Sequence, residues 1–311
     1  MDQRIPVIID VDTGIDDAFA LLLAATHPRL NLLGVTCVDG NAPLVDVVRN
    51  TIRVLDAAQR HDVPVVAGAH RPLVAQPHYA FDVHGRDRFG GIDWPEPSRV
   101  ASGLDAVSWL RDTIVSSASP VTLITLAPLT NIAQLLQRHP ETTSNLERIV
   151  VMGGSAGPGN VTALAEFNVH HDPHAAAIVF SCEVPITMYG LDVFNDVVID
   201  RTDVKQLAES PSQPAQLAAR LATFFADVLG YPLCIGDAGA VCAVIDPAAL
   251  STTPLVTTVV TEAGPAYGMT AVDRRPVVYD GAIPLAGRVV DVALDINASR
   301  YSELWLNSLM S

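Results

Sequence analysis

Hydrophobic and polar positions alternate in blocks along most of this chain. Short runs of Ile, Val and Leu that end at Gly, Pro or Asp predict buried strands, and longer amphipathic stretches between them predict helices. Strands are predicted near residues 5–10, 32–38, 63–68, 121–126, 148–152, 185–189, 255–261 and 288–294, and helices near 16–23, 43–59, 104–115, 128–136, 173–181, 204–229, 237–244 and 302–310. Repeated strand–helix units predict an α/β fold with a mostly parallel central sheet flanked by helices. We expect one domain, residues 1–311.

Two stretches interrupt this alternation. Residues 70–102 contain Pro72, Pro77, Pro95 and Pro97 together with the pair Gly90-Gly91, and they are too long for an ordinary connector. We interpret them as an inserted loop or an active-site lid. A second lid candidate covers about residues 222–236.

The amino-acid composition limits the kinds of molecule that this protein could bind. Hydrophobic residues make up 49% of the chain and charged residues 17%, which is enough for a large core. The formal net charge of −15 argues against a nucleic-acid or anionic-membrane surface. No segment approaches the roughly 20 apolar residues that span a membrane. The four cysteines show no CxxC spacing and the N-terminal residues lack a signal-peptide pattern, so we expect a cytoplasmic protein.

Four carboxylates crowd the end of the first predicted strand. Asp10 and Asp12 follow the Ile/Val run, and Asp16 and Asp17 open the next helix. A helix N-terminus stabilises a negative charge by only about 0.3–1 kcal/mol, so either some of these groups are protonated or a cation lies among them. Oxygen ligands favour Ca²⁺ or Mg²⁺ over zinc. The alternative is one helix-capping aspartate surrounded by solvated acids.

Further polar residues stand where other strands should end. These are Asp39-Gly40-Asn41, Asn131, Gly159-Asn160 and Glu166-Phe167-Asn168. The carboxyl edge of an open α/β sheet is where ligands bind. Amides and carboxylates with little positive charge suit a neutral, polyhydroxylated ligand, whereas a phosphate would require Lys, Arg or a glycine-rich loop. Each Asn taken singly is more typical of a turn, but this alternative weakens because so many of them fall at predicted strand ends.

The ordered motifs resemble the nucleoside hydrolase family, the inosine-uridine preferring nucleoside N-ribohydrolases. Asp10–Asp17 matches the DxDxGxDD signature of that family. The resemblance continues through Gly40-Asn41, His84-Gly85, Pro128–Asn131, Met152–Gly154, Gly159-Asn160, Glu166–Asn168, Asp172-Pro173 and Gly190–Asp192. It implies an open, Rossmann-like fold with inserted active-site loops and a homotetramer or homodimer. The implied activity is Ca²⁺-dependent hydrolysis of the N-glycosidic bond of ribonucleosides.

The resemblance also assigns a role to individual positions. It implies Ca²⁺ ligands at Asp12, Asp17, the backbone carbonyl of Leu126 and Asp237, with Asp10 in support. It places Asp16, Asn41 and Asn168 on the ribose hydroxyls, Asn160 and Glu166 at the 5′-hydroxyl, and Met152 against the sugar. Asp12 would act as the general base that activates water for attack with inversion.

The half of the site that receives the base departs from the family pattern. Many members carry a histidine directly before the last metal-binding aspartate, and this chain has Gly236 there. His84 in the long loop is the candidate leaving-group acid; an exposed loop histidine is an equal alternative. Trp94, Phe224, Phe225 and Tyr231 are candidates to stack on the base. The choice between purine and pyrimidine stays open.

Two other functions compete with this interpretation. A haloacid dehalogenase-type phosphatase also begins with a strand and a DxD pair, but Gly14 stands where that family wants Thr or Val. A nucleoside-binding relative with weak catalysis would explain the missing histidine. Release of ribose from a panel of nucleosides separates the enzyme from the binding protein.

Overall fold

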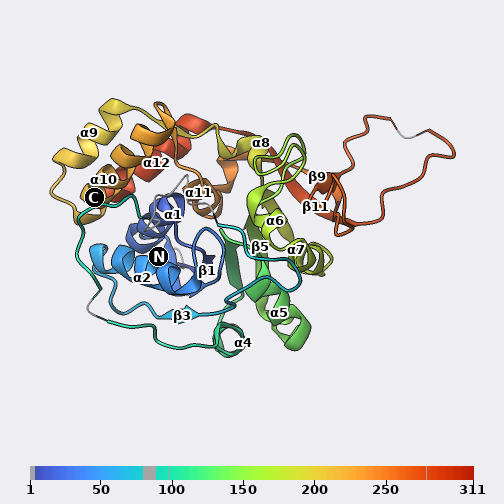
Figure 1. The fold of residues 1–311 in the computed structure, drawn as a ribbon, viewed down its shortest axis with the longest axis horizontal. Helices are drawn as coiled ribbons and strands as arrows, with labels where there is room; N and C mark the ends of the chain where they lie inside the picture. Colours follow the sequence, from blue (N-terminus) through green and yellow to red (C-terminus); the bar gives the residue numbers. More distant parts are fainter. Residues whose placement is uncertain (1–3, 80–88, 98, 278) are drawn as a thin grey trace.

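A single large sheet organises the molecule. The computed structural model describes residues 4–79, 89–97, 99–277 and 279–311, without the side chain of Leu229. Within these residues the sheet has nine strands in the order β10-β9-β11-β6-β5-β4-β1-β2-β3 (Figure 1). The strands are β1 (Ile5–Val11), β2 (Leu30–Cys37), β3 (Val65–Ala67), β4 (Val121–Thr125), β5 (Leu146–Met152), β6 (Ile186–Tyr189), β9 (Leu250–Val259), β10 (Thr270–Val272) and β11 (Arg288–Ile296). A separate two-stranded sheet pairs β7 (Val198–Ile199) with β8 (Leu233–Cys234).

The large sheet is mostly parallel. The pairings from β3 through β2, β1, β4, β5 and β6 to β11 are all parallel, and only β9 runs antiparallel to its two neighbours. The buried Ile/Val-rich strands in its centre are typical of a sheet that is covered on both faces.

Helices cover both faces of the sheet. Their bounds are α1 (Ile15–Thr26), α2 (Leu44–Ala57), α4 (Ala106–Ser116), α5 (Thr130–Arg138), α6 (Phe167–His171), α7 (Pro173–Phe180), α8 (Leu191–Phe194), α9 (Arg201–Glu209), α10 (Gln213–Leu229), α11 (Ala238–Ile245) and α12 (Ala298–Met310). Short 3₁₀ turns lie at Pro140–Asn145 and Pro247–Ala249. One hydrophobic core contains α1, α2, α10, α11 and α12, and a second contains α4, α5 and α7. The predicted α/β architecture is therefore confirmed.

The structure corrects the predicted helix over residues 204–229. Two helices, α9 and α10, replace it, and they are separated at Ser210, Pro211 and Ser212. Proline has no backbone N–H and disfavours the helical conformation of the preceding residue, so α9 ends before it. Residues 222–229, the first part of the second lid candidate, form the last turns of α10. Within the described residues, no helix is long and apolar enough to cross a membrane.

Candidate active site

The carboxyl ends of β1 and β2 and the start of α1 bring the crowded aspartates together. Asp17, in the first turn of α1, folds back onto the end of β1: its Oδ2 accepts from the backbone N–H of Gly14 at 2.9 Å, and its Oδ1 from that of Asp12 at 3.3 Å. These bonds satisfy N–H groups that a helix start and a strand end would otherwise leave unpaired. The local fold therefore fixes Asp12 and Asp17 side by side.

Three carboxylates converge tightly enough to hold a metal ion. Asp16, Asp17 and Asp237 each offer an oxygen atom, and these atoms lie within 4.8 Å of one another. Asp237 directly precedes α11, so distant parts of the chain build the group. An all-oxygen donor set fits a hard divalent cation. The sequence-based set of Asp12, Asp17 and Asp237 overlaps with this group, and the structure adds Asp16 to it.

Burial makes these carboxylates costly to ionise. Desolvation, followed by repulsion from Asp16, raises the pKa of Asp17 to about 8. Desolvation and neighbouring carboxylates also raise the pKa values of Asp12 and Asp237 well above their ordinary range. One oxygen of Asp12, Oδ1, is buried and has no hydrogen-bond partner among the described residues. A cation would compensate the buried charges, so the residues fit a metal.

Asp10 lies beside this cluster but faces other partners. Its Oδ1 accepts from the Thr36 hydroxyl at 2.5 Å and from the Asn131 amide at 2.8 Å. The Asn131 amide nitrogen also donates to the carbonyl of Cys37 at 3.1 Å. Desolvation raises the pKa of Asp10 to about 7. Asp10 thus ties β1 to β2 and α5, an arrangement that suits a supporting role.

A second polar group forms around the start of α6. The Glu166 carboxylate caps this short helix, because it accepts from the backbone N–H groups of Asn168 at 2.9 Å and Val169 at 3.1 Å. Its Oε2 also accepts from Gly154 at 3.0 Å, and desolvation raises its pKa. Asn160 fixes the preceding loop by accepting from the N–H of Phe167 at 2.9 Å. The structure therefore brings Asn160, Glu166 and Asn168 into one neighbourhood.

Asn168 connects this second group to the ends of β4 and β5. Its amide nitrogen donates to the carbonyl of Leu126 at 2.9 Å and to that of Met152 at 3.2 Å. The Leu126 carbonyl, which the family resemblance assigns to the metal, therefore already accepts a hydrogen bond. Met152 is 4% exposed and its sulfur lies 3.4 Å from the same amide.

Gly236 is required by close packing. Its φ of +53° is in the left-handed region that favours glycine. A Cβ atom there would lie 2.8 Å from Cζ of Phe194 and 3.0 Å from Cβ of Asp16. A histidine cannot occupy this position without displacing one of them. The other candidate leaving-group acid, His84, lies outside the described residues.

Sequence reasoning named Gly40 only as part of a motif and missed Thr270 altogether. A Cβ atom at Gly40 would lie 2.0 Å from Oδ2 of Asp12, so the absence of a side chain there lets β2 approach the aspartate. Thr270 of β10 clamps the loop after β5, since its hydroxyl accepts from the N–H of Ser155 at 2.8 Å and donates to the carbonyl of Ser155 at 2.7 Å. No motif marks Thr270, because it lies 115 positions away from its partner.

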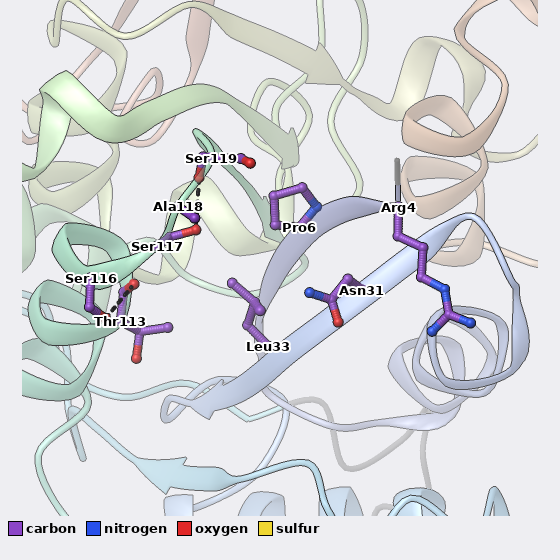
Figure 2. Close-up of a pocket in the computed structure, with 9 residues that line it drawn as sticks. All are labelled: Arg4, Pro6, Asn31, Leu33, Thr113, Ser116, Ser117, Ala118 and Ser119. Carbon is purple, nitrogen blue, oxygen red and sulfur yellow. Dashed lines mark hydrogen bonds between the residues drawn. The ribbon is translucent and has the colours of Figure 1, made fainter. Parts of the chain in front are cut away.

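A pocket without acidic residues lies at the opposite edge of the sheet. The cavity has a volume of about 600 Å³. Figure 2 shows its lining beside the amino-terminal halves of β1 and β2 and at the end of α4 and the residues that follow it. Its lining is Arg4, Pro6, Asn31, Leu33, Thr113 and Ser116–Ser119, with no carboxylate among them. The acid-rich carboxyl edge is therefore the candidate active site.

A mostly parallel α/β sheet with buried carboxylates gathered at its carboxyl edge is typical of metal-dependent α/β enzymes. Comparison with known proteins identifies the family within this class. A family model described as inosine-uridine preferring nucleoside hydrolase matches residues 7–303. The chain therefore belongs to the inosine-uridine preferring nucleoside hydrolase family, and its enzyme class is nucleoside N-ribohydrolase.

Individual relatives agree with this assignment. The chain is 40% identical over 277 residues to a pyrimidine-specific ribonucleoside hydrolase, RihA, of Shewanella sp. strain MR-7, and the match covers 86% of each chain. Among solved structures, a plant nucleoside hydrolase, the PpNRh1 enzyme, superposes with a TM-score of 0.92 at 26% identity and 99% coverage of both chains. A purine-preferring ribonucleoside hydrolase from Gardnerella vaginalis reaches a TM-score of 0.88 at 27% identity, covering 98% of each chain.

Proposed function

We propose that this chain is a Ca²⁺-dependent hydrolase of pyrimidine ribonucleosides that releases the free base and ribose. The observation that carries the proposal is the convergence of the carboxylates of Asp16, Asp17 and Asp237. Beside them, the buried Asp12 carboxylate has one oxygen, Oδ1, without a hydrogen-bond partner among the described residues. Oxygen donors alone favour Ca²⁺ over zinc, and a site with flexible carboxylates favours it over Mg²⁺.

The chain's own residues supply the acid–base and binding steps. When bound, Ca²⁺ would hold the attacking water and lower its pKa. Asp12 accepts the proton of that water at Oδ1, because its Oδ2 is engaged by the N–H of Asn41 at 2.6 Å. Asn41, Asn168 and Asp16 bind the ribose hydroxyls and hold the sugar in one pose. Asn160 and Glu166 bind the 5′-hydroxyl.

The leaving base departs from a sugar that carries positive charge in the transition state. The buried carboxylates stabilise this oxocarbenium-like state. Attack by the water that Asp12 deprotonates, on the face opposite the departing base, would give inversion at the anomeric carbon. Detection of a covalent ribosyl-enzyme would contradict direct displacement.

Asp16 has two roles in this proposal. The family resemblance assigns it to the ribose, and the geometry also places its carboxylate with those of Asp17 and Asp237. A carboxylate has two oxygens, so it can contact the metal and accept from a hydroxyl. Asp16→Asn should weaken both Ca²⁺ and nucleoside binding, which calorimetric titration of each ligand would measure.

The preference for pyrimidines rests on the relatives that share about two-fifths of their residues with this chain. A panel of uridine, cytidine, inosine, adenosine and guanosine, with free ribose as the readout, tests both activity and base preference. We expect kcat/KM to be higher for uridine and cytidine than for the purines. Higher values for inosine would overturn the preference, and tight binding without any ribose release would overturn the activity.

We further propose a cytoplasmic homo-oligomer. The four cysteines are free, which suits a reducing compartment. Light scattering on the eluting protein would give a mass of two or four chains; a single-chain mass would contradict an oligomer.

A further inference from the structure

A buried ion pair joins two parts of the site. The proposed mechanism gives this pair no role. Asp39 follows β2, and His171 ends α6. Nε2 of His171 lies 3.4 Å from Oδ1 of Asp39, and the two side chains are 0% and 3% exposed, respectively. Neither residue belongs to the acidic metal group or to the proposed ribose contacts.

The hydrogen bonds around His171 determine where its protons lie. Nδ1 of His171 is 3.0 Å from the carbonyl oxygen of His78, and a carbonyl can only accept, so Nδ1 carries a hydrogen. A neutral imidazole would then point the lone pair of Nε2 at the Asp39 carboxylate. Among the described residues, neither Nε2 nor the facing Oδ1 has a hydrogen-bond partner. Two facing lone pairs repel in a buried site, which favours a further proton on one of the two atoms.

The pair also holds the start of the long loop. Oδ2 of Asp39 accepts from the Tyr79 hydroxyl at 3.2 Å, and the backbone N–H of Asp39 donates to the carbonyl of Ala69 at 2.9 Å. Together with the bond from His171 to the His78 carbonyl, these contacts attach residues 69–79 to β2 and α6. Asp39 is two residues from Asn41, and His171 is three residues from Asn168.

We propose that Asp39 and His171 are positioning residues, that the further proton is bound to Nε2 of His171, and that the resulting buried ion pair keeps residues 39–41 and 166–168 at the spacing that the ribose requires. The inference rests on the proposed ribose contacts of Asn41 and Asn168. If the pair is broken, the two segments separate in the free enzyme, and the substrate must bring them together. Only the fraction of enzyme in the competent arrangement then binds, so the apparent affinity falls while the bound complex is unchanged.

Ring ¹⁵N NMR of the full-length protein tests the proton on Nε2 without depending on activity. His171→Gln assigns the signals by their loss. We expect both ring nitrogens of His171 to carry a proton in wild-type protein and Nε2 to lose its proton in Asp39→Asn. A wild-type ring protonated on one nitrogen only would overturn the inference.

Kinetics with paired variants test the positioning role. In Asp39→Asn the amide can donate to a neutral Nε2 and still accept from Tyr79, so KM should stay within about threefold of wild type. Asp39→Ala removes the tie and should raise KM about tenfold or more while kcat changes less than about threefold. Equal KM values for the two variants would overturn the role.

Two controls make the result specific. His61 forms an exposed pair with Asp56, with Nδ1 of His61 3.0 Å from Oδ1 of Asp56, so His61→Gln should leave KM unchanged. If Asp39→Ala does not fold, His171→Gln replaces it in the kinetic comparison. If wild-type protein releases no ribose from any nucleoside, the proposed function fails, and the NMR result still decides the state of the pair.

Discussion

The backbone N–H of Asn41 donates to Oδ2 of Asp12 at 2.6 Å, although the two residues are 29 positions apart in the chain. This bond orients the Asp12 carboxylate so that its other oxygen, Oδ1, is free of hydrogen bonds from the described residues. The contact depends on Gly40, because a Cβ atom there would lie 2.0 Å from Oδ2. Gly40-Asn41 therefore orients the Asp12 carboxylate, in addition to the ribose contact proposed for Asn41.

Gly40→Ala should damage both stability and catalysis. The added methyl group overlaps with the Asp12 carboxylate and the chain must shift, which costs about 1–3 kcal/mol of unfolding free energy in a packed interior. Urea denaturation measures the loss, and ribose release should fall with it. Gly103→Ala is the control, since its Cβ would meet only Val66 at an ordinary 3.4 Å. Wild-type activity in Gly40→Ala would contradict the contact.

Asp12→Asn should separate binding from turnover. The amide oxygen can still accept from Asn41, but an amide cannot take a proton from water, and loss of a general base lowers kcat by about 10²–10⁴-fold. Calorimetric titration with a nucleoside should give a dissociation constant close to that of wild type. Asp62→Asn, an exposed aspartate paired with Arg60, serves as the control. A variant that kept most of its kcat would exclude Asp12 as the base.

Local sequence patterns predicted the architecture and many of the site residues. They did not predict the contacts between site residues that are far apart in the chain. The alternating strands and helices, and the Asp10–Asp17 motif at the end of β1, follow from hydrophobic periodicity and turn residues close together in sequence. Asp237 was found only through the family motif, because nothing near it in the chain marks a ligand. The sequence predicted a cation or protonation among four carboxylates that include Asp16. The grouping of Asp16 with Asp237 could not be predicted, since it depends on how α1 and α11 pack.

Long-range packing explains what the sequence left undetermined. The Asp39–His171 pair and the Ser155–Thr270 clamp each join residues more than a hundred positions apart, so no spacing rule finds them. Gly236 carries a positive φ that periodicity cannot reveal, and its packing against Phe194 is a tertiary contact. The break between α9 and α10, by contrast, could have been predicted from Pro211.

Chelation should stop ribose release and calcium should restore it. The oxygen atoms of Asp16, Asp17 and Asp237 fit a hard cation, and Ca²⁺ accepts irregular carboxylate geometry more readily than Mg²⁺. We expect activity in chelated protein to recover with Ca²⁺ more fully than with Mg²⁺ at equal concentration. Asp237→Asn should raise the Ca²⁺ concentration needed for half recovery. Unchanged rates in protein shown by elemental analysis to be metal-free would contradict the role of the metal.

The stability of the metal-free protein should fall as pH rises. Asp10 and Asp17 have pKa values raised in the fold from 3.8 to about 7 and about 8, chiefly because burial disfavours the charged form. A carboxyl with a raised pKa favours the folded state while it is protonated there, and this contribution is lost as pH rises through the folded pKa. Between about pH 4 and pH 8 unfolding therefore releases protons, and each group lowers the unfolding free energy by up to about 1.4 kcal/mol per pH unit.

Urea denaturation of chelated protein at several pH values measures this slope. Saturating Ca²⁺ should raise stability most at the alkaline end, because metal ligands bind in their ionised form and compete with protons. Asp10→Asn removes one titrating group outside the metal cluster and should flatten the profile of the chelated protein. Stability of the chelated protein that is constant or rises from pH 4 to pH 8 would show that these carboxyls are ionised without the metal. The cluster would then need no cation to compensate its charge.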